Sequence, residues 1–245
     1  MDLVKCCEII DSIPGAATLE DVHIVCKNLC EHLGFDYFFY CAKLPALSMK
    51  SRVLVIDGYP PEWRERYVAR GYISIDPMIS YCFKSSVPLP WDELGRVEKM
   101  NKAELEFMRE CGDYGLRSGV SFPLQKSHGE CAMLSLASGE VHMQSRIAEA
   151  IPFAHLVFLH IHEAVRRIEK VTANFENYRL SEREMECLRW ATDGKTSWET
   201  SKILGISERT VIFHLQNVFG KLEVTNKLQA VARAVSLGLI DPLRS

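Results

Sequence analysis

Residues 197–216 read SWETSKILGISERTVIFHLQ and have the residue spacing of a helix-turn-helix. The small residue Ser201 stands at the fifth position of this stretch, Gly205 at the ninth and Val211 at the fifteenth. A small side chain lets two helices approach closely, glycine adopts the left-handed backbone of a tight turn, and a β-branched side chain fills the core between the helices. The stretch therefore predicts two helices that meet at Gly205, the second of which reads DNA.

Side chains that cap helices extend this prediction to a complete domain. A serine or threonine with a glutamate three residues later forms a capping box, and serine or asparagine alone can also cap a helix. Four helix starts carry such residues: Ser181 with Glu184, Thr196 with Glu199, Ser207, and Asn226 with Gln229. We therefore expect residues 180–245 to form an all-α, four-helix DNA-binding domain.

The helix after the turn has an apolar face and a face suited to DNA. At 100° per residue, the inward stripe consists of Val211, Leu215, Val218 and Leu222. The outward face and its flanks carry Arg209, Thr210, Ile212, Phe213, Gln216, Asn217 and Gly220. In a major groove, glutamine can pair with adenine, arginine with guanine, and apolar groups can contact thymine methyl groups. The surrounding lysines can contact phosphates or remain solvated surface residues: Lys195, Lys202, Lys221 and Lys227.

Length and charge indicate two domains of ordinary size. The chain has 245 residues, and the net charge is +1 for residues 175–245 and −4 for residues 1–174. Neither half is strongly basic, so affinity for DNA must come from local placement of charge and from dimerisation. We find no N-terminal apolar signal segment and no run long enough to span a bilayer, which indicates a cytoplasmic protein without membrane contact.

The nine cysteines are scattered along the chain and do not form a zinc motif. Cys26 and Cys30 lie one helical turn apart, but no second pair with zinc-like spacing accompanies them. We expect all nine cysteines to be reduced and to act as small hydrophobic residues, and we expect neither a metal nor a cofactor.

The first two thirds of the chain alternate helical and extended patterns. Helical periodicity covers residues 19–33, 60–70, 101–111 and 144–171. Apolar and aromatic runs predict strands at residues 35–42, 52–56, 119–124 and 131–137, the last two joined by a hairpin around His128. Helices before, between and after an antiparallel sheet form an α/β/α sandwich, which is suited to enclosing a small ligand. The expected fold class is α+β, with this sandwich followed by the helical domain.

Short motifs that characterise a known family occur in both halves. The C-terminal motifs, which other regulators share, are LSERE at 180–184, Leu188, GKT at 194–196, SERTV at 207–211, His214 and KL at 221–222. The more specific N-terminal residues are Tyr59, Trp63, Tyr67, Asp76 with Pro77, Trp91, Gly115, Gly119 and Ser135. Together they resemble the LuxR family of quorum-sensing transcription factors. The resemblance implies an autoinducer-binding domain at residues 1–165, a linker at 166–179 and a DNA-binding domain at 180–245.

The resemblance also implies a site for an acyl-homoserine lactone, made by Tyr59, Trp63, Asp76, Trp91 and Ser135. A buried acyl-lactone needs a partner for each polar group once water is removed. The carboxylate of Asp76 can accept from the amide N–H, and the indole of Trp63 can donate to the lactone carbonyl. Tyr59 and Ser135 can donate to the amide carbonyl, while Trp91 can wall the ring. Taken alone, each aromatic residue also fits a core role, and Asp76 also fits a turn.

The same resemblance implies a transcriptional activator that works as a homodimer. Its expected partners are the autoinducer, double-stranded DNA with a palindromic promoter site, and RNA polymerase. The helices expected at residues 144–171 and 226–237 keep an apolar stripe after their packing faces are counted, so they are the expected dimer surfaces.

Three residues depart from the family pattern. Met78 stands where a small hydroxyl residue is common, and Cys41 stands on the first strand where some members have glycine. Both residues affect the room for an acyl tail, so the sequence leaves the length of that tail open. Gly220 lies inside the recognition helix, where it costs about 1 kcal/mol relative to alanine and could permit close approach of the backbone.

Two other function classes fit the sequence less well. Residues 53–58, VLVIDG, resemble a strand that delivers a phosphoacceptor, so the alternative is a two-component response regulator phosphorylated at Asp57. A receiver also needs an acidic pair after an earlier strand and a lysine after a later one, and neither is evident. An enzyme is disfavoured because no nucleophile elbow, P-loop or paired zinc motif is present. His160 and His162 diverge by about 200° on a helix and cannot share one metal.

Overall fold

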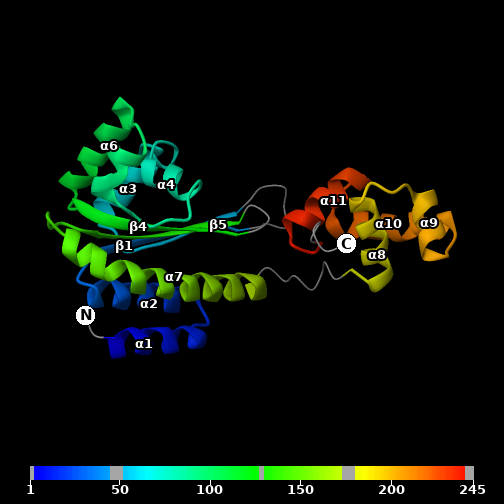
Figure 1. Cartoon of the computed structure of the whole chain (residues 1–245), viewed down its shortest axis with the longest axis horizontal. Coiled ribbons are helices and arrows are strands. Elements are labelled where there is room, and N and C mark those ends of the chain that lie inside the picture. Colours follow the sequence, from blue (N-terminus) through cyan, green and yellow to red (C-terminus); the bar gives the residue numbers. More distant parts are fainter. Residues whose placement is uncertain (1–2, 45–51, 127–129, 173–179, 241–245) are drawn as a thin grey trace. The chain divides into compact units, whose positions relative to one another are not determined.

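The computed structural model describes residues 3–44, 52–126, 130–172 and 180–240. Its contacts divide the chain into two compact units. The first contains a sheet and the helices up to α7, and the second contains α8 to α11 (Figure 1). None of the described helices is both long enough and apolar enough to cross a membrane.

The sheet of the first unit has five strands in the order β2-β1-β5-β4-β3. The strands are β1 (Tyr37–Leu44), β2 (Arg52–Asp57), β3 (Leu89–Pro90), β4 (Ser118–Gln125) and β5 (Cys131–Ser138). The pairs β1–β5, β5–β4 and β4–β3 are antiparallel. All four strands expected from the sequence are present, whereas the two-residue strand β3 was not predicted. The expected hairpin loop around His128 lies outside the described residues.

Helices cover both faces of this sheet. The longer ones are α1 (Leu3–Ser12), α2 (Leu19–His32), α3 (Pro61–Ala69), α4 (Pro77–Cys82), α6 (Lys102–Asp113) and α7 (Gln144–Thr172). The short α5 (Leu94–Val97) and the 3-10 turns η1 (Ile13–Gly15), η2 (Tyr72–Ser74) and η3 (Trp91–Glu93) connect them. In Figure 1, α2 and α7 lie on one face, while α3, α4 and α6 lie on the other. This arrangement confirms the α/β/α sandwich.

Alternation along the strands assigns side chains to the two faces. Tyr40 and Leu134 point into the apolar core shared with α2 and α7, whereas Cys41 and Met133 pack against α4. The stripe of α7 that packs on the sheet continues through Ile168. The helix runs from Gln144 to Thr172, close to the helical pattern over residues 144–171. Residues 166–172, which the expected domain boundaries place in the linker, are therefore helical. The rest of the expected linker, 173–179, lies outside the described residues.

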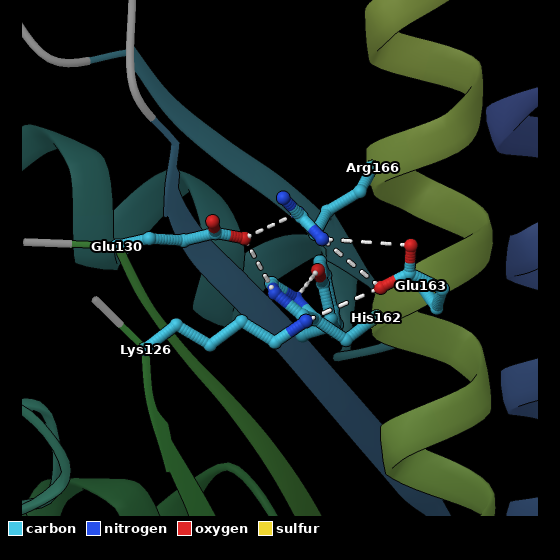
Figure 2. A network of polar contacts seen from close by, with 6 residues as sticks. Lys126, Glu130, His162, Glu163 and Arg166 are labelled. Carbon is cyan, nitrogen blue, oxygen red and sulfur yellow. Dashed lines mark hydrogen bonds and ion pairs between the residues drawn. The ribbon is translucent and has the colours of Figure 1, made fainter. Parts of the chain in front are cut away.

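A polar network holds the second half of α7 to the sheet (Figure 2). The hydroxyl of Tyr40 lies 2.9 Å from Nδ1 of the buried His162, and Nε2 of His162 lies 2.8 Å from Oε1 of Glu130. Nε of Arg166 lies 2.9 Å from the same oxygen. With the proton on Nε2, the imidazole donates to Glu130 and accepts from Tyr40, so each of its polar atoms is satisfied. His160 on the same helix is exposed, and the two histidines diverge as their spacing predicts.

The nine cysteines are free, and eight of them are buried. Burial raises the pKa of Cys30 and of Cys41 to about 12, so these thiols stay protonated at neutral pH. Cys7 is exposed, so it does not fit the expectation that all nine cysteines act as small hydrophobic residues.

The second unit consists of α8 (Glu182–Thr192), α9 (Ser197–Leu204), α10 (Glu208–Leu222) and α11 (Lys227–Ser236). All four begin at the expected caps, and the capping boxes at Ser181 and Thr196 are complete. Gly205 ends α9 in the left-handed conformation, with φ +66°. The expected inward stripe of α10, which includes Val211 and Val218, is buried in the core of this unit. These features confirm the helix-turn-helix.

Candidate functional site

A small cavity lies on the face of the sheet opposite α7. All five residues expected to bind ligand line it: Tyr59, Trp63, Asp76, Trp91 and Ser135. Its volume, measured for the centre of a water-sized sphere, is about 30 Å³. That space holds about two water molecules. A ligand the size of an acyl-lactone therefore fits only if the lining side chains move apart.

Asp76 both caps α4 and faces the cavity. Its Oδ1 accepts from the backbone N–H of Met78 at 2.9 Å and of Ile79 at 3.4 Å. Its Oδ2 accepts from the hydroxyl of Tyr67 at 3.0 Å. Burial raises the pKa of Asp76 to about 6, although these hydrogen bonds act in the opposite direction. The turn role and the ligand role, which the sequence left as alternatives, are thus compatible in one residue.

Trp63 and Tyr59 place polar atoms in an aromatic cluster. Trp63 is buried among Tyr72, Phe107 and Tyr114, with ring centroids between 5.2 and 5.8 Å away. Tyr59 stacks on Phe39 with centroids 5.5 Å apart. Within the described part of the chain, neither the indole N–H of Trp63 nor the hydroxyl of Tyr59 has a hydrogen-bond partner.

Buried tryptophan and tyrosine side chains usually find a partner for their polar atom. Burial also raises the pKa of Tyr59 well above its ordinary value, so its hydroxyl keeps its proton. Two donors are therefore available to a molecule that enters the cavity.

Trp91 and Ser135 are joined through a residue that the sequence analysis missed. The indole N–H of Trp91 donates to Oγ of Ser121 at 3.0 Å, and that oxygen lies 2.6 Å from Oγ of Ser135. Ser121 stands opposite Ser135 in the β4–β5 register. The ring of Trp91 lies against Gly119, where an added Cβ would be 2.9 Å from ring atom Cε2. The ring of Trp91 therefore lines the cavity, while its indole N–H is held within the protein.

Other residues that line the cavity were not assigned to the site from the sequence. They are Phe39, Tyr67, Met78, Phe107, Met108, Cys111, Leu116 and Met133. Of the two departures that bear on the room for an acyl tail, Met78 faces the cavity, while Cys41 belongs to the apolar cluster that contains Met78. The alternation of side chains along a strand could have identified Phe39 and Met133 as neighbours on one face of the sheet. The cavity residues that lie on helices can be identified only once the tertiary fold is known.

The outward face of α10 is exposed as its periodicity predicts. Arg209, Ile212, Phe213 and Gln216 are exposed, with Phe213 at 57%. Thr210 and Asn217, expected on the flanks, are half-buried. Exposed apolar side chains on a helix that also carries arginine and glutamine suit contact with base edges.

The four lysines around α10 differ in their surroundings. Nζ of Lys221 lies 2.6 Å from Oε2 of Glu184, and the ammonium of Lys227 donates to the backbone carbonyl of Lys195. Lys202 lies over the ring of Trp198, with Nζ 5.6 Å from the centroid. Lys221 can therefore contact a phosphate only by sharing its charge with Glu184, whereas Lys202 is exposed.

Both units of the chain match known protein families. Residues 18–165 match the model of the autoinducer binding domain, and residues 178–234 match that of the bacterial regulatory proteins of the luxR family. The chain is 34% identical over 213 residues to the transcriptional activator protein AhyR of Aeromonas hydrophila, which covers 86% of this chain and 82% of AhyR. It is 32% identical over 235 residues to the transcriptional activator protein LuxR of Aliivibrio fischeri, which covers 95% of this chain and 93% of LuxR.

A solved structure shows a similar fold. SdiA in complex with octanoyl-rac-glycerol superposes with a TM-score of 0.77 at 26% identity. The match covers 96% of this chain and 94% of that one. A crystal structure of Escherichia coli SdiA in space group P6522 gives the same score.

Proposed function

Since the chain belongs to the LuxR family of autoinducer-binding transcriptional activators, we propose that residues 1–165 bind an acyl-homoserine lactone and that residues 180–245 bind a palindromic promoter site. The family consists of transcriptional regulators, not enzymes. The proposed site of DNA binding implies action in the cytoplasm.

The observation that carries the ligand proposal is the convergence of complementary polar groups on one apolar cavity. Asp76 supplies an acceptor, Trp63 and Tyr59 supply donors without partners among the described residues, and Ser135 supplies a hydroxyl. An amide N–H and two carbonyl oxygens of an acyl-lactone match this set. SdiA, the relative with a similar fold, was solved with an octanoyl glycerol, which also joins an acyl chain to a polar head.

Calorimetric titration of the full chain with lactones of increasing acyl length tests this proposal. We expect Asp76→Ala to weaken binding by about 1–3 kcal/mol, because the ligand N–H loses its acceptor. Asp76→Asn keeps a residue that caps α4 and so separates the loss of charge from the loss of the cap. A wild-type chain that binds no lactone of the series would refute the proposal.

We propose that the regulator acts as a homodimer. On α7, Leu156 and Leu159 are exposed, and on α11, Leu228 is 79% exposed. Each helix also has a buried stripe in its own unit, so these side chains remain available to a second copy. Mass measurement in solution at several concentrations tests the proposal, and Leu156→Glu together with Leu228→Glu should shift the protein toward the monomer.

For DNA we propose that α10 lies in the major groove of each half of an inverted repeat, with half-sites about one helical turn apart. Gln216 and Arg209 then lie near base edges. Lys195, Lys202 and Lys221 lie near phosphates, with Thr210, Ile212, Phe213 and Asn217 completing the contact surface. Gln216→Ala should change the preference at one symmetric pair of base positions by about 1–3 kcal/mol. Lys202→Ala should weaken binding to all sequences and reduce the salt dependence by about one unit.

Selection from a randomised operator library separates these two behaviours. A uniform loss of affinity in Gln216→Ala, without a change in base preference, would mean that α10 is rotated from the orientation proposed. Lys202 is the better phosphate probe, because Lys221→Ala also removes the partner of the buried Glu184.

We further propose that α9 contacts RNA polymerase. Trp198 and Ile203 are exposed on this helix, outside the face of α10 assigned to the groove. An exposed tryptophan outside the groove-facing surface can bury its apolar ring against a protein partner. Trp198→Ala should retain operator binding and lose activation in a transcription assay with purified polymerase, and loss of both together would contradict this role.

The response-regulator alternative is not favoured. Asp57 ends β2 and its Oδ1 lies 2.9 Å from Nε of Arg64, so its carboxylate is already paired. Residues 18–165, which include Asp57, match the autoinducer binding domain.

A further inference from the structure

A second and larger cavity opens on the first unit, beside the cavity described above. Its volume, by the same measure, is about 450 Å³, within the range of about 300–1,000 Å³ found for small-molecule sites. Trp91 and Met108 line both cavities and therefore form the wall between them. We call the larger cavity the outer groove.

The floor of the outer groove is apolar. Met143 and Ile147 are each 4% exposed and line it together with the buried Gly119. The rings and thioethers of Trp91 and Met108 extend this surface. An acyl chain placed here would remove apolar area from water at about 25 cal/mol per Å².

The rim of the outer groove carries positive charge. Arg109 and Arg117 both line it and are exposed. Within the residues that the structure describes, neither guanidinium forms an ion pair, and Nε of Arg117 donates weakly to the carbonyl of Gly112 at 3.3 Å. The one carboxylate on the lining, Asp92, accepts from Nε2 of Gln144 at 3.1 Å. The two arginines and this carboxylate together give the rim a net charge of +1.

The start of α7 adds to this positive rim. The helix begins at Gln144, which lines the outer groove, and its first turn contains no acidic residue. The free N–H groups of a helix start carry a partial positive charge that favours an anion. The cationic rim and the apolar floor together are complementary to a molecule that has an acyl chain and an anionic head group.

The inner cavity has the opposite preference. Its only charged side chain is the carboxylate of Asp76, which would repel a second carboxylate. A neutral acyl-lactone suits the inner cavity, whereas an acyl carboxylate suits the outer groove.

We propose that the outer groove is a second ligand site that binds an acyl carboxylate, with the chain on Met143 and Ile147 and the carboxylate between Arg109 and Arg117. Guanidinium groups bind carboxylates through paired, charge-assisted hydrogen bonds, which suits this head group. The site goes beyond the proposed lactone site and does not depend on it.

Calorimetric titration of the full chain with decanoate tests the site. We expect Arg109→Gln combined with Arg117→Gln to weaken decanoate binding about tenfold or more, since two charge-assisted contacts are lost. Arg96→Gln, an exposed arginine outside the groove, should bind decanoate like the wild type. Decanol, which has the same chain and no charge, should bind the wild type at least about tenfold more weakly than decanoate.

The inner cavity provides the decisive control. Asp76→Asn should leave decanoate binding unchanged, because Asp76 lines the inner cavity and not the outer groove. If decanoate bound in the inner cavity, loss of the repelling carboxylate would strengthen its binding. The proposal is overturned if the wild type does not bind decanoate, if the double arginine variant binds it as well as the wild type, or if Asp76→Asn binds it more tightly than the wild type. None of these outcomes depends on whether the chain binds a lactone.

Discussion

The two faces of the sheet differ in how completely the protein satisfies its own side chains. On the α7 face, apolar residues fill the core, and the buried His162 has partners for both ring nitrogens in Tyr40 and Glu130. On the opposite face lies a cavity, and the donors of Trp63 and Tyr59 lack partners among the described residues. Apart from the buried Nδ1 of His155 on α7, which has no partner among the described residues, the α7 face is complete. The opposite face lines a cavity that a ligand enters only if the lining side chains move apart.

This difference assigns separate roles to the two faces. A core with matched polar groups specifies the fold without help from a ligand. A face with a cavity and free donors gains stability when a molecule fills it, because a ligand that binds only the folded state shifts the folding equilibrium. We therefore expect the α7 face to be independent of the autoinducer and the opposite face to depend on it.

The largest effect should come from breaking the complete face. Glu130→Ala leaves His162 and Arg166 without their shared acceptor and should lower the free energy of unfolding by about 3–5 kcal/mol. Hydrogen exchange of the β1 and β5 amides measures this loss. Glu163→Ala is the matched control, because its carboxylate is 60% exposed and its ion pairs contribute about 1 kcal/mol or less. Equal losses in both variants would mean that the network does not hold this face.

The next effect concerns the wall of the cavity. A Cβ at Gly119 would lie 2.6 Å from the carbonyl oxygen of Leu136 and 2.9 Å from Trp91. Gly119→Ala should therefore destabilise the first unit by about 1–3 kcal/mol and displace Trp91. In Gly112→Ala the new Cβ meets nothing closer than 3.8 Å and should leave ligand binding intact. Thermal unfolding and lactone titration of both variants test this contrast, and normal lactone affinity in Gly119→Ala would contradict it.

The dependence of binding on pH tests the charge in the cavity. Asp76 has a folded pKa of about 6, raised by burial, so it takes up a proton between pH 7 and pH 5. A ligand N–H requires the carboxylate, so lactone affinity should fall about tenfold over this interval. The contribution of Asp76 to the stability of the ligand-free chain should change in the opposite direction, rising as the pH falls through 6, because the unfolded chain binds the proton less tightly.

Asp76→Asn provides the control for this titration. The amide does not ionise and should remove the pH dependence of lactone binding. Titrations at pH 5, 6 and 7 with both proteins are sufficient. A wild-type affinity that does not change between pH 7 and pH 5 would mean that the carboxylate does not bind the ligand.

The smallest effect on lactone binding should come from a change at Tyr67, whose hydroxyl donates a hydrogen bond to Asp76. Tyr67→Phe removes the hydrogen bond to Oδ2 and should weaken lactone binding by about 1 kcal/mol. Tyr81→Phe is the matched control, because its hydroxyl bonds to the backbone carbonyl of Val87 outside the cavity. Equal lactone affinities in the two variants, measured by calorimetry, would remove Tyr67 from the site.

Long elements with a clear period could be predicted from the sequence. The apolar stripes of α7 and α10 and the caps at Ser181, Thr196 and Ser207 placed these helices within a few residues. The six-residue α4 and the two-residue β3 are too short to show a period. α4 begins at Pro77 after the capping side chain of Asp76, a residue for which the sequence leaves a turn role and a ligand role open.

The site could be predicted only in part. One cavity brings together residues from α3, from the cap of α4, from η3 and from β5. The family motif named these residues, but it gave no information on how they are arranged in space. The contacts between Tyr67 and Asp76 and between Trp91 and Ser121 depend on the tertiary fold. The position of Lys221 in the last turn of α10 suits a phosphate contact or a solvated surface, but charge alone does not reveal its ion pair with Glu184.

Hydrogen exchange of the full chain, with and without saturating N-octanoyl-homoserine lactone, tests the central claim most directly. We predict slower exchange on ligand binding in residues 59–82 and 107–116, which surround the cavity, and no change in residues 154–168 of α7. Equal protection of both regions, or protection of α7 alone, would contradict the division of roles between the two faces of the sheet.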